Sequence, residues 1–229
     1  MTRLPNRRLT LARLAVWGSC AALFVGVVAF SRAPEPASPA RRATPRTVAI
    51  PFPVTLEIAE GTNAAYRVRE QFVGIKFPSD AVGRSTAVTG QITFNKDGSI
   101  DSASSKFQFD LRTLQSDQSM RDGYIQRNTL ETDKYPMAVF VPRTIVDMPN
   151  PLTGQFGFEL SGDMTVHGVT APLTWQGIAT VDRSSGAVAG RAETHFKFGT
   201  FGLTPPKIMR LLSVADSINL EVEFRTRVK

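Results

Sequence analysis

The sequence is poor in the side chains that most catalytic and metal sites require. Its 229 residues include one cysteine, Cys20, and two histidines, His167 and His195. A single cysteine excludes an intramolecular disulfide and a thiolate metal cluster. The histidines have neither H-x-x-x-H nor H-E-x-x-H spacing, so a zinc site would need carboxylates from distant parts of the chain. We therefore expect neither a metal nor another cofactor.

The short motifs of common enzyme classes are absent as well. The chain has no G-x-S-x-G nucleophile elbow and no G-x-x-x-x-G-K-[ST] phosphate loop. The adjacent opposite charges Arg121-Asp122 and Asp133-Lys134 are most simply solvated or helix-capping pairs, and nothing resembles an acid–base dyad. These observations favour a protein that is not an enzyme.

Excess charge is missing from most of the chain. The net charge is +7, and residues 1–53 carry all of it, with eight arginines and one glutamate. The other 176 residues contain 19 basic and 19 acidic side chains. A neutral body has no large basic face for a polyanion, so we expect no nucleic-acid partner.

Only one long apolar run is present, and it lies near the N-terminus. Residues 14–30 are uncharged and follow four arginines, as in a segment whose N-terminus stays in the cytoplasm. Residues 1–30 are therefore predicted to be a signal anchor or a signal peptide. The 17-residue run is at the lower limit for a spanning helix, and Ala29-Phe30-Ser31 resembles a cleavage site. The body is expected outside the cytoplasm, in the periplasm or at the outer face of the cytoplasmic membrane, either anchored through residues 14–30 or secreted.

Beyond the apolar run the composition changes twice. Residues 31–53 are dominated by Pro, Ala, Arg and Ser and are predicted to be a flexible linker. Residues 54–229 alternate apolar and polar side chains in eight or nine runs separated by turn-forming residues, without a βαβ repeat. This pattern predicts a closed or nearly closed antiparallel barrel. The clearest strands are 106–112, 155–161 and 217–225.

One hairpin has a recognisable turn, and two other segments break the strand pattern. Residues 162–175 are predicted to form one hairpin, with His167 in its turn. Residues 115–130 have helix-like apolar spacing, and Pro205–Leu212 combine a proline-rich start with an apolar side. Both of the latter segments are predicted to be short helices that bury their apolar sides at the mouth of the barrel.

Phenylalanine is abundant in the body of the chain. Of its 15 copies, 13 lie after residue 50, and most occupy the inward-facing phase of a predicted strand. The interior of an eight-stranded barrel can be filled by side chains or can hold one slender ligand. The phenylalanines therefore either fill a core or form the wall of an elongated apolar pocket. Alternation with a period of two is the same in both cases.

Four blocks of sequence occur in an order that is specific when they are taken together. They are Gly90-Gln91-Ile92-Thr93-Phe94, then Arg121-Asp122 with Asp133-Lys134-Tyr135-Pro136, then Gly162-Asp163-Met164-Thr165-Val166-His167-Gly168, and finally Phe201-Gly202 with Pro205-Pro206. Over residues 66–229 these blocks resemble the YceI-like family, bacterial envelope proteins with a lipocalin-like barrel that is associated with polyisoprenoid binding.

The resemblance implies a barrel that holds a long apolar chain, with the polar end of that chain near the helices at the mouth. This chain departs from the family in two polar places. It has Arg69-Glu70-Gln71-Phe72 where members commonly show Asp and then His-Ser, and Arg121-Asp122-Gly123-Tyr124 where many have Arg-Asp-x-His. The head group is therefore the part of the ligand that the resemblance specifies least.

The expected fold is all-β, an eight-stranded antiparallel lipocalin-like barrel with one or two short helices at its mouth, preceded by an N-terminal hydrophobic helix. The expected function is to bind and sequester or carry an elongated lipid, which could be a polyisoprenoid, an isoprenoid quinone or a fatty acyl chain. The alternative is a filled barrel that acts as an envelope stress or protein-interaction module. The sequence does not decide whether the chain forms a homodimer. The predicted ligand-binding residues are Phe94, Phe107, Phe109, Met120, Tyr124, Phe140, Phe156, Phe158, Trp175, Phe196 and Phe198.

Overall fold

A computed structural model of the chain describes residues 48–229. The predicted signal anchor or signal peptide, the N-terminal hydrophobic helix and most of the linker therefore lie outside the described residues. Within residues 48–229, no helix has the length and apolar character needed to cross a membrane.

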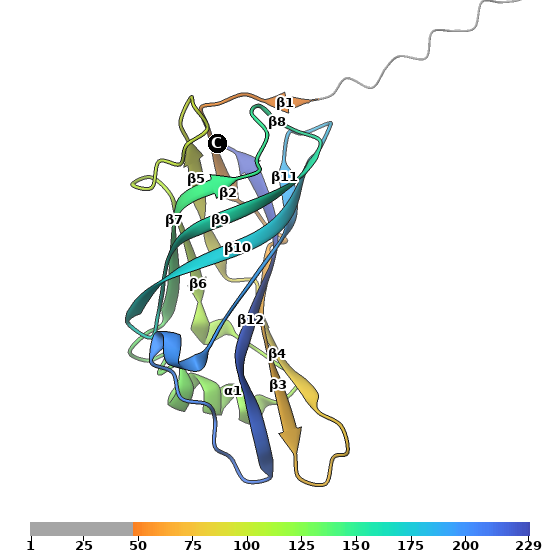
Figure 1. The fold of residues 1–229 in the computed structure, drawn as a ribbon, viewed down its shortest axis with the longest axis vertical. Coiled ribbons are helices and arrows are strands. Elements are labelled where there is room, and N and C mark those ends of the chain that lie inside the picture. Colours follow the sequence, from red (N-terminus) through yellow and green to blue (C-terminus); the bar gives the residue numbers. More distant parts are fainter. Residues whose placement is uncertain (1–47) are drawn as a thin grey trace, which may run out of the picture. The chain divides into compact units, whose positions relative to one another are not determined.

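The main sheet is antiparallel and contains ten strands that occupy eight positions around a closed ring (Figure 1). Its strands are β2 (Val54–Ile58), β3 (Asn63–Phe72), β4 (Ser79–Ser85), β5 (Val88–Phe94), β6 (Lys106–Asp110), β7 (Met137–Val146), β9 (Gln155–Val166), β10 (Val169–Val181), β11 (Val188–Phe196) and β12 (Leu211–Val228). The predicted eight-stranded antiparallel barrel is confirmed.

Two positions of the ring are each shared by two strands placed end to end. The long strand β12 pairs with β3 over most of its length and with β2 near its C-terminus. In the same way, β4 pairs with β3 and β5 pairs with β2. The pairing of β11 with β12 then closes the ring, which removes the free sheet edges that would otherwise invite aggregation.

The two ends of the barrel are built differently. At one end, β1 (Ala49–Ile50) and β8 (Leu152–Thr153) form a small separate sheet. At the other end, β3, β4 and the start of β12 extend beyond the ring, and a helical segment lies beside them (Figure 1). That segment contains η1 (Leu111–Thr113), α1 (Ser119–Tyr124) and the π-helical turn η2 (Ile125–Thr129).

The predicted hairpin over residues 162–175 is confirmed. Strands β9 and β10 pair without a break, and a two-residue turn, His167-Gly168, joins them. Both turn residues have positive φ, 54° and 75°, as expected in a turn whose twist matches that of the flanking strands. The Nε2 atom of His167 lies 2.8 Å from the carboxylate of Glu131, so the histidine helps to fix the turn.

One of the two predicted helices is present. The expectation over residues 115–130 is met by α1 and η2. The helix predicted over Pro205–Leu212 is wrong, because this segment is an irregular connection that enters β12 at Leu211. Consecutive prolines keep the preceding residues extended, and Leu211 pairs with Phe72 of β3 instead of joining a helix. A short 3-10 turn that the sequence pattern did not predict, η3 (Phe198–Phe201), precedes the connection.

Candidate functional site

The barrel contains two apolar cavities along its axis. The mouth cavity has a volume of about 600 Å³ and lies at the end that carries α1. The inner cavity has a volume of about 120 Å³ and lies toward β1 and β8. Three residues line both cavities and form the partition between them: Phe109, Trp175 and Val222.

Strands and helix contribute to the mouth cavity through different periodicities. On β3, alternate residues face inward because successive side chains of a strand point to opposite sides. This alternation places Tyr66, Val68, Glu70 and Phe72 on the cavity wall. On the helical segment, Met120 and Tyr124 share one face because residues four apart are neighbours on a helix, and Ile125 also lines the cavity.

Aromatic rings occupy most of the inner end. The rings of Phe158 and Phe224 pack edge to face with centroids 6.1 Å apart, and Phe52 lies 5.3 Å from Phe94. The side chain of Leu152 on β8 is almost completely buried there. This half of the barrel is a packed core with little free volume.

All eleven predicted ligand-binding residues line one of the two cavities, but the structure divides them between the two. Met120, Tyr124, Phe196 and Phe198 line the mouth cavity. Phe109 and Trp175 belong to the partition. The others line the inner cavity: Phe94, Phe107, Phe140, Phe156 and Phe158.

Much of the cavity wall on β3 was not among the predicted ligand-binding residues. Tyr66, Val68 and Glu70 lie on it, and alternation between residues 64 and 72 was the signal that could have found them. The charged Glu70 hides that signal, because it occupies an inward position where the strand pattern requires an apolar residue.

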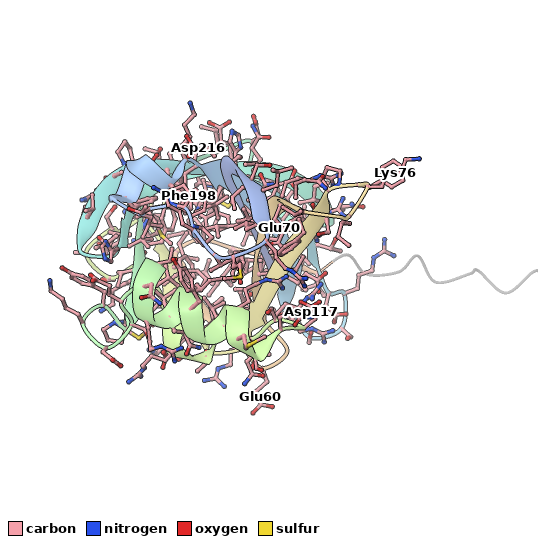
Figure 2. The ribbon with its side chains drawn as sticks, turned by 90° about the horizontal axis from the view of Figure 1, so that it is seen from below. Glu60, Glu70, Lys76, Asp117, Phe198 and Asp216 are labelled. Carbon is pink, nitrogen blue, oxygen red and sulfur yellow. The ribbon has the colours of Figure 1, made fainter. Side chains whose placement is uncertain are left out.

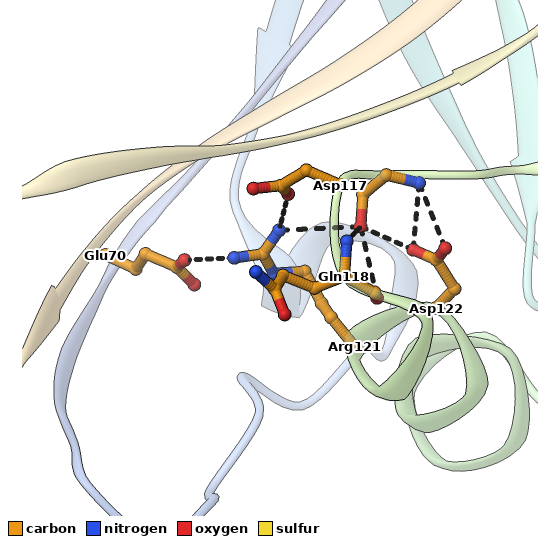
Figure 3. A network of polar contacts seen from close by, with 6 residues as sticks. Glu70, Asp117, Gln118, Arg121 and Asp122 are labelled. Carbon is orange, nitrogen blue, oxygen red and sulfur yellow. Dashed lines mark hydrogen bonds and ion pairs between the residues drawn. The ribbon is translucent and has the colours of Figure 1, made fainter.

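An ion-pair network crosses the opening between β3 and α1 (Figure 3). Nη2 of Arg121 donates to Oε1 of Glu70 at 2.7 Å, and Nη1 donates to Asp117 at 2.6 Å. Both side chains of the first pair are largely shielded, with 16% and 8% exposure. Asp122 completes the network by accepting hydrogen bonds from the backbone N–H and the hydroxyl of Ser116.

Burial dominates the pKa shifts of Glu70 and of its neighbour on β3, Tyr66. It raises the pKa of Glu70 above its ordinary value of 4.5, and the nearby charge of Arg121 opposes that rise. Burial also raises the pKa of the Tyr66 hydroxyl to about 12, so this tyrosine stays neutral. The charged residues that line the mouth cavity are Glu70, Arg121 and Glu221, so its one cation among the described residues is already neutralised.

Two buried polar atoms near the cavity have no hydrogen-bond partner within residues 48–229. They are Nε1 of Trp175 and Oγ1 of Thr129, and both residues line the mouth cavity. A buried donor without a partner costs about 1–3 kcal/mol, and neither atom exposes surface to the cavity.

The described residues do not bring together the ligands of a metal centre. No group of three or more His, Cys, Asp or Glu residues in the described range could hold a metal ion. His167 is held in its turn by Glu131, and His195 is exposed on β11. The arrangement that the structure does present is an apolar chamber with one paired charge at its entrance.

Sequence comparison finds a known domain over most of the described chain. Residues 58–226 match the model of the YceI-like domain. A UPF0312 protein of Pseudomonas putida is 34% identical over 109 residues, which are 44% of this chain and 54% of that protein. The chain therefore spans about half the length of this relative. A UPF0312 protein of Vibrio campbellii is 29% identical over 139 residues, which are 58% of this chain and 69% of that protein.

Two solved structures share the fold at low sequence identity. One is a polyisoprenoid-binding domain from Saccharophagus degradans implicated in plant cell wall breakdown. It has a TM-score of 0.58 and 12% identity, with 77% of this chain and 99% of that one covered. The other is BcnA of Burkholderia cenocepacia, with a TM-score of 0.51, 17% identity and coverage of 73% and 96%.

Proposed function

Because the chain belongs to the YceI-like family, we propose that it binds an elongated apolar lipid inside its barrel and sequesters or carries that lipid in the bacterial envelope. The observation that carries the proposal is the mouth cavity of about 600 Å³. This volume lies within the range of about 300–1,000 Å³ that is typical of ligand sites. The polyisoprenoid-binding domain of the same fold from Saccharophagus degradans supports it.

The binding energy in this proposal comes from burial of the lipid tail. Each methylene group removed from water contributes about 0.8 kcal/mol, so a chain of isoprenoid length binds without a charged contact. The wall of the mouth cavity suits this mode, because apart from Glu70, Arg121 and Glu221 its side chains are apolar or uncharged.

The charges at the mouth favour a neutral head group. A phosphate or carboxylate held by Arg121 would displace Glu70 and would leave a buried carboxylate without its partner. An uncharged head group would instead leave the ion pair of Arg121 with Glu70 intact. We therefore favour an uncharged isoprenoid, such as an isoprenoid quinone, over a prenyl phosphate or a fatty acid.

The proposed role is non-enzymatic and extracytoplasmic. The absence of common catalytic motifs from the sequence supports the first point, and the order of arginines and apolar residues in residues 1–30 supports the second. The mass of the mature protein shows whether residues 1–30 are retained as an anchor or removed as a signal peptide.

Lipid extraction and native mass spectrometry of the purified chain test lipid binding. The discriminating variant is Ala81→Phe, because Ala81 is buried on the wall of the mouth cavity and a phenyl ring there fills part of it. The matched control is Val82→Phe, since Val82 is the next residue on β4 and does not line the cavity. We expect bound lipid on the wild-type chain and on the control. The amount of bound lipid should be at least tenfold lower for Ala81→Phe. A wild-type chain that stays empty when prenyl lipids are offered would refute the proposal.

A filled barrel that acts as an interaction module is the second candidate, and the packing of the inner end favours it. There the aromatic side chains leave only about 120 Å³. This candidate predicts that prenyl lipids do not raise the melting temperature and that cross-linking recovers one specific protein. Lipid binding predicts a rise in melting temperature that grows with lipid concentration.

A further inference from the structure

Two neighbouring loops at the mouth of the barrel expose an unusual amount of apolar surface. We call residues 72–79 and 204–212 the rim loops. Their exposed apolar side chains include Phe77 at 71% and Met209 at 93% exposure. The other exposed ones on these loops are Val73, Ile75, Ile208 and Leu212. Clusters of this kind mark interaction surfaces, whereas single exposed apolar residues are normal.

The rim loops lie side by side and project from the same end of the barrel. The backbone N–H of Val73 donates to the carbonyl of Arg210 at 2.8 Å, and Phe72 pairs with Leu211. Figure 1 shows both loops extending past the ring at the α1 end. In Figure 2, which looks at the structure from this end, Lys76 points outward from the tip of the β3–β4 loop.

The charge of the rim loops has one sign. They contain Lys76, Lys207 and Arg210 but no aspartate or glutamate, although the chain from residue 54 onward is neutral. The nearest acidic residue on β4, Asp80, is already paired with Arg67 and Arg69. The tips therefore combine large apolar side chains with three cations.

The apolar surface of the rim loops continues into the mouth cavity. Ile208 and Met209 belong both to the exposed tip and to the cavity wall. Met120 on α1 does the same at 85% exposure. A lipid tail can therefore pass between the tips and the cavity along apolar side chains.

We propose that the rim loops dock on an anionic phospholipid bilayer, with their apolar tips in the acyl region and their three cations among the head groups, so that the mouth cavity opens directly onto lipid. Apolar residues flanked by lysine and arginine are the composition that inserts into the membrane interface. A second copy of the chain fits this surface less well, because it would place three cations against three cations. Docking would serve to exchange lipid between the bilayer and the cavity, and this purpose rests on the proposed function.

Spin labels on the full chain test the docking and its orientation. In a Cys20→Ser background, one label is placed at Ile75→Cys in a rim loop. A second protein carries it at Arg183→Cys, which is exposed in the turn between β10 and β11 at the opposite end. With phosphatidylglycerol vesicles, oxygen should relax the label at position 75, and a water-soluble nickel complex should relax the label at position 183. Comparison of the two positions separates rim docking from any membrane contact made by residues 14–30, which both proteins share.

Variants of the rim loops measure the strength of docking. Loss of two apolar tips in Phe77→Ser with Met209→Ser should lower the docked fraction at least about tenfold. The matched control Ile178→Ser removes an exposed apolar side chain from the barrel wall and should leave docking unchanged. Lys76→Gln and Lys207→Gln should each weaken binding about fivefold, and the effect should disappear at high salt.

Each remaining outcome overturns one proposal and spares the other. A label at position 75 that stays in water with vesicles, on a chain that contains extracted lipid, overturns docking and leaves the proposed function standing. A docked label on a chain whose cavity stays empty overturns the proposed function and leaves docking standing. A label at position 75 that becomes shielded without vesicles, in proportion to protein concentration, shows that a second copy covers the rim loops and overturns bilayer docking.

Discussion

The two halves of this barrel follow the same strand alternation but have opposite interiors. In the inner half, the inward positions hold phenylalanines such as Phe94, Phe156 and Phe158, which pack into a core. In the mouth half, inward positions on β3, β4 and β7 hold Ala64, Ala81 and Ala138, which line the mouth cavity. Alternation therefore decides which side chains face inward, and their size decides whether the interior is solid or hollow.

A second difference between the halves is how each is closed. Strand β6 is only five residues long, and after Asp110 the chain leaves the ring to form η1 and α1. The mouth is therefore covered by a short helical segment joined to β3 through the Arg121–Glu70 pair, whereas the small β1–β8 sheet lies at the other end. The mouth half is expected to be the less stable and more adaptable of the two.

The largest effect should come from the packed half. Phe94 has 2% exposure and lines the inner cavity, so Phe94→Ala removes a buried ring and leaves a void. We expect a loss of about 3–5 kcal/mol in the free energy of unfolding, measured by urea denaturation. A loss below about 1 kcal/mol would mean that the inner half is loosely packed, and the contrast between the halves would fail.

The ion pair that closes the mouth should give the next largest effect. Arg121→Met leaves Glu70 buried without its partner, and we expect a loss of about 3 kcal/mol at neutral pH. Burial raises the pKa of Glu70 above 4.5, so this carboxyl becomes protonated as the pH falls. The loss of stability in the variant should therefore shrink at low pH, where Glu70 is neutral in the folded and the unfolded state. Adding Glu70→Gln to the variant should restore most of the stability. If the loss is the same at low and neutral pH, an unpaired Glu70 is not its cause.

Insertion of a large side chain, instead of removal of one, also distinguishes the two halves. Ala179 has 2% exposure and lines the inner cavity, whereas Ala81 lines the mouth cavity. We expect Ala179→Phe to lose about 1–3 kcal/mol of unfolding free energy through overpacking, and Ala81→Phe to lose less than about 1 kcal/mol. Equal losses at the two sites would show that the mouth is not hollow in solution.

The smallest effect should come from the edge of the mouth. Met120 is 85% exposed, so Met120→Ser should change the free energy of unfolding by no more than about 0.5 kcal/mol. The same variant should still bind lipid less tightly, because Met120 lines the cavity. A calorimetric titration with a prenyl lipid checks the second statement, with Val82→Phe as a control that stays away from the cavity.

Prediction from sequence worked best where local chemistry and pattern agree. The strand alternation and the turn residues were enough for the individual strands and for the hairpin at His167, because both depend on neighbouring residues. The helix predicted at Pro205–Leu212 failed because pairing with β3 outweighs the apolar pattern of that segment. The ion pair of Glu70 with Arg121 was not predicted, because the two residues are 51 positions apart in the sequence.

The sequence by itself determined the inward and outward faces of the strands, since side chains alternate with a period of two whatever the strand packs against. It also placed the excess charge in residues 1–53 and the apolar run before the body. Only the tertiary structure decided that Phe94 and Phe158 fill a core while Phe196 and Phe198 line a cavity. The physical reason is that free volume depends on the combined size of side chains from strands far apart in the chain, which no local pattern records.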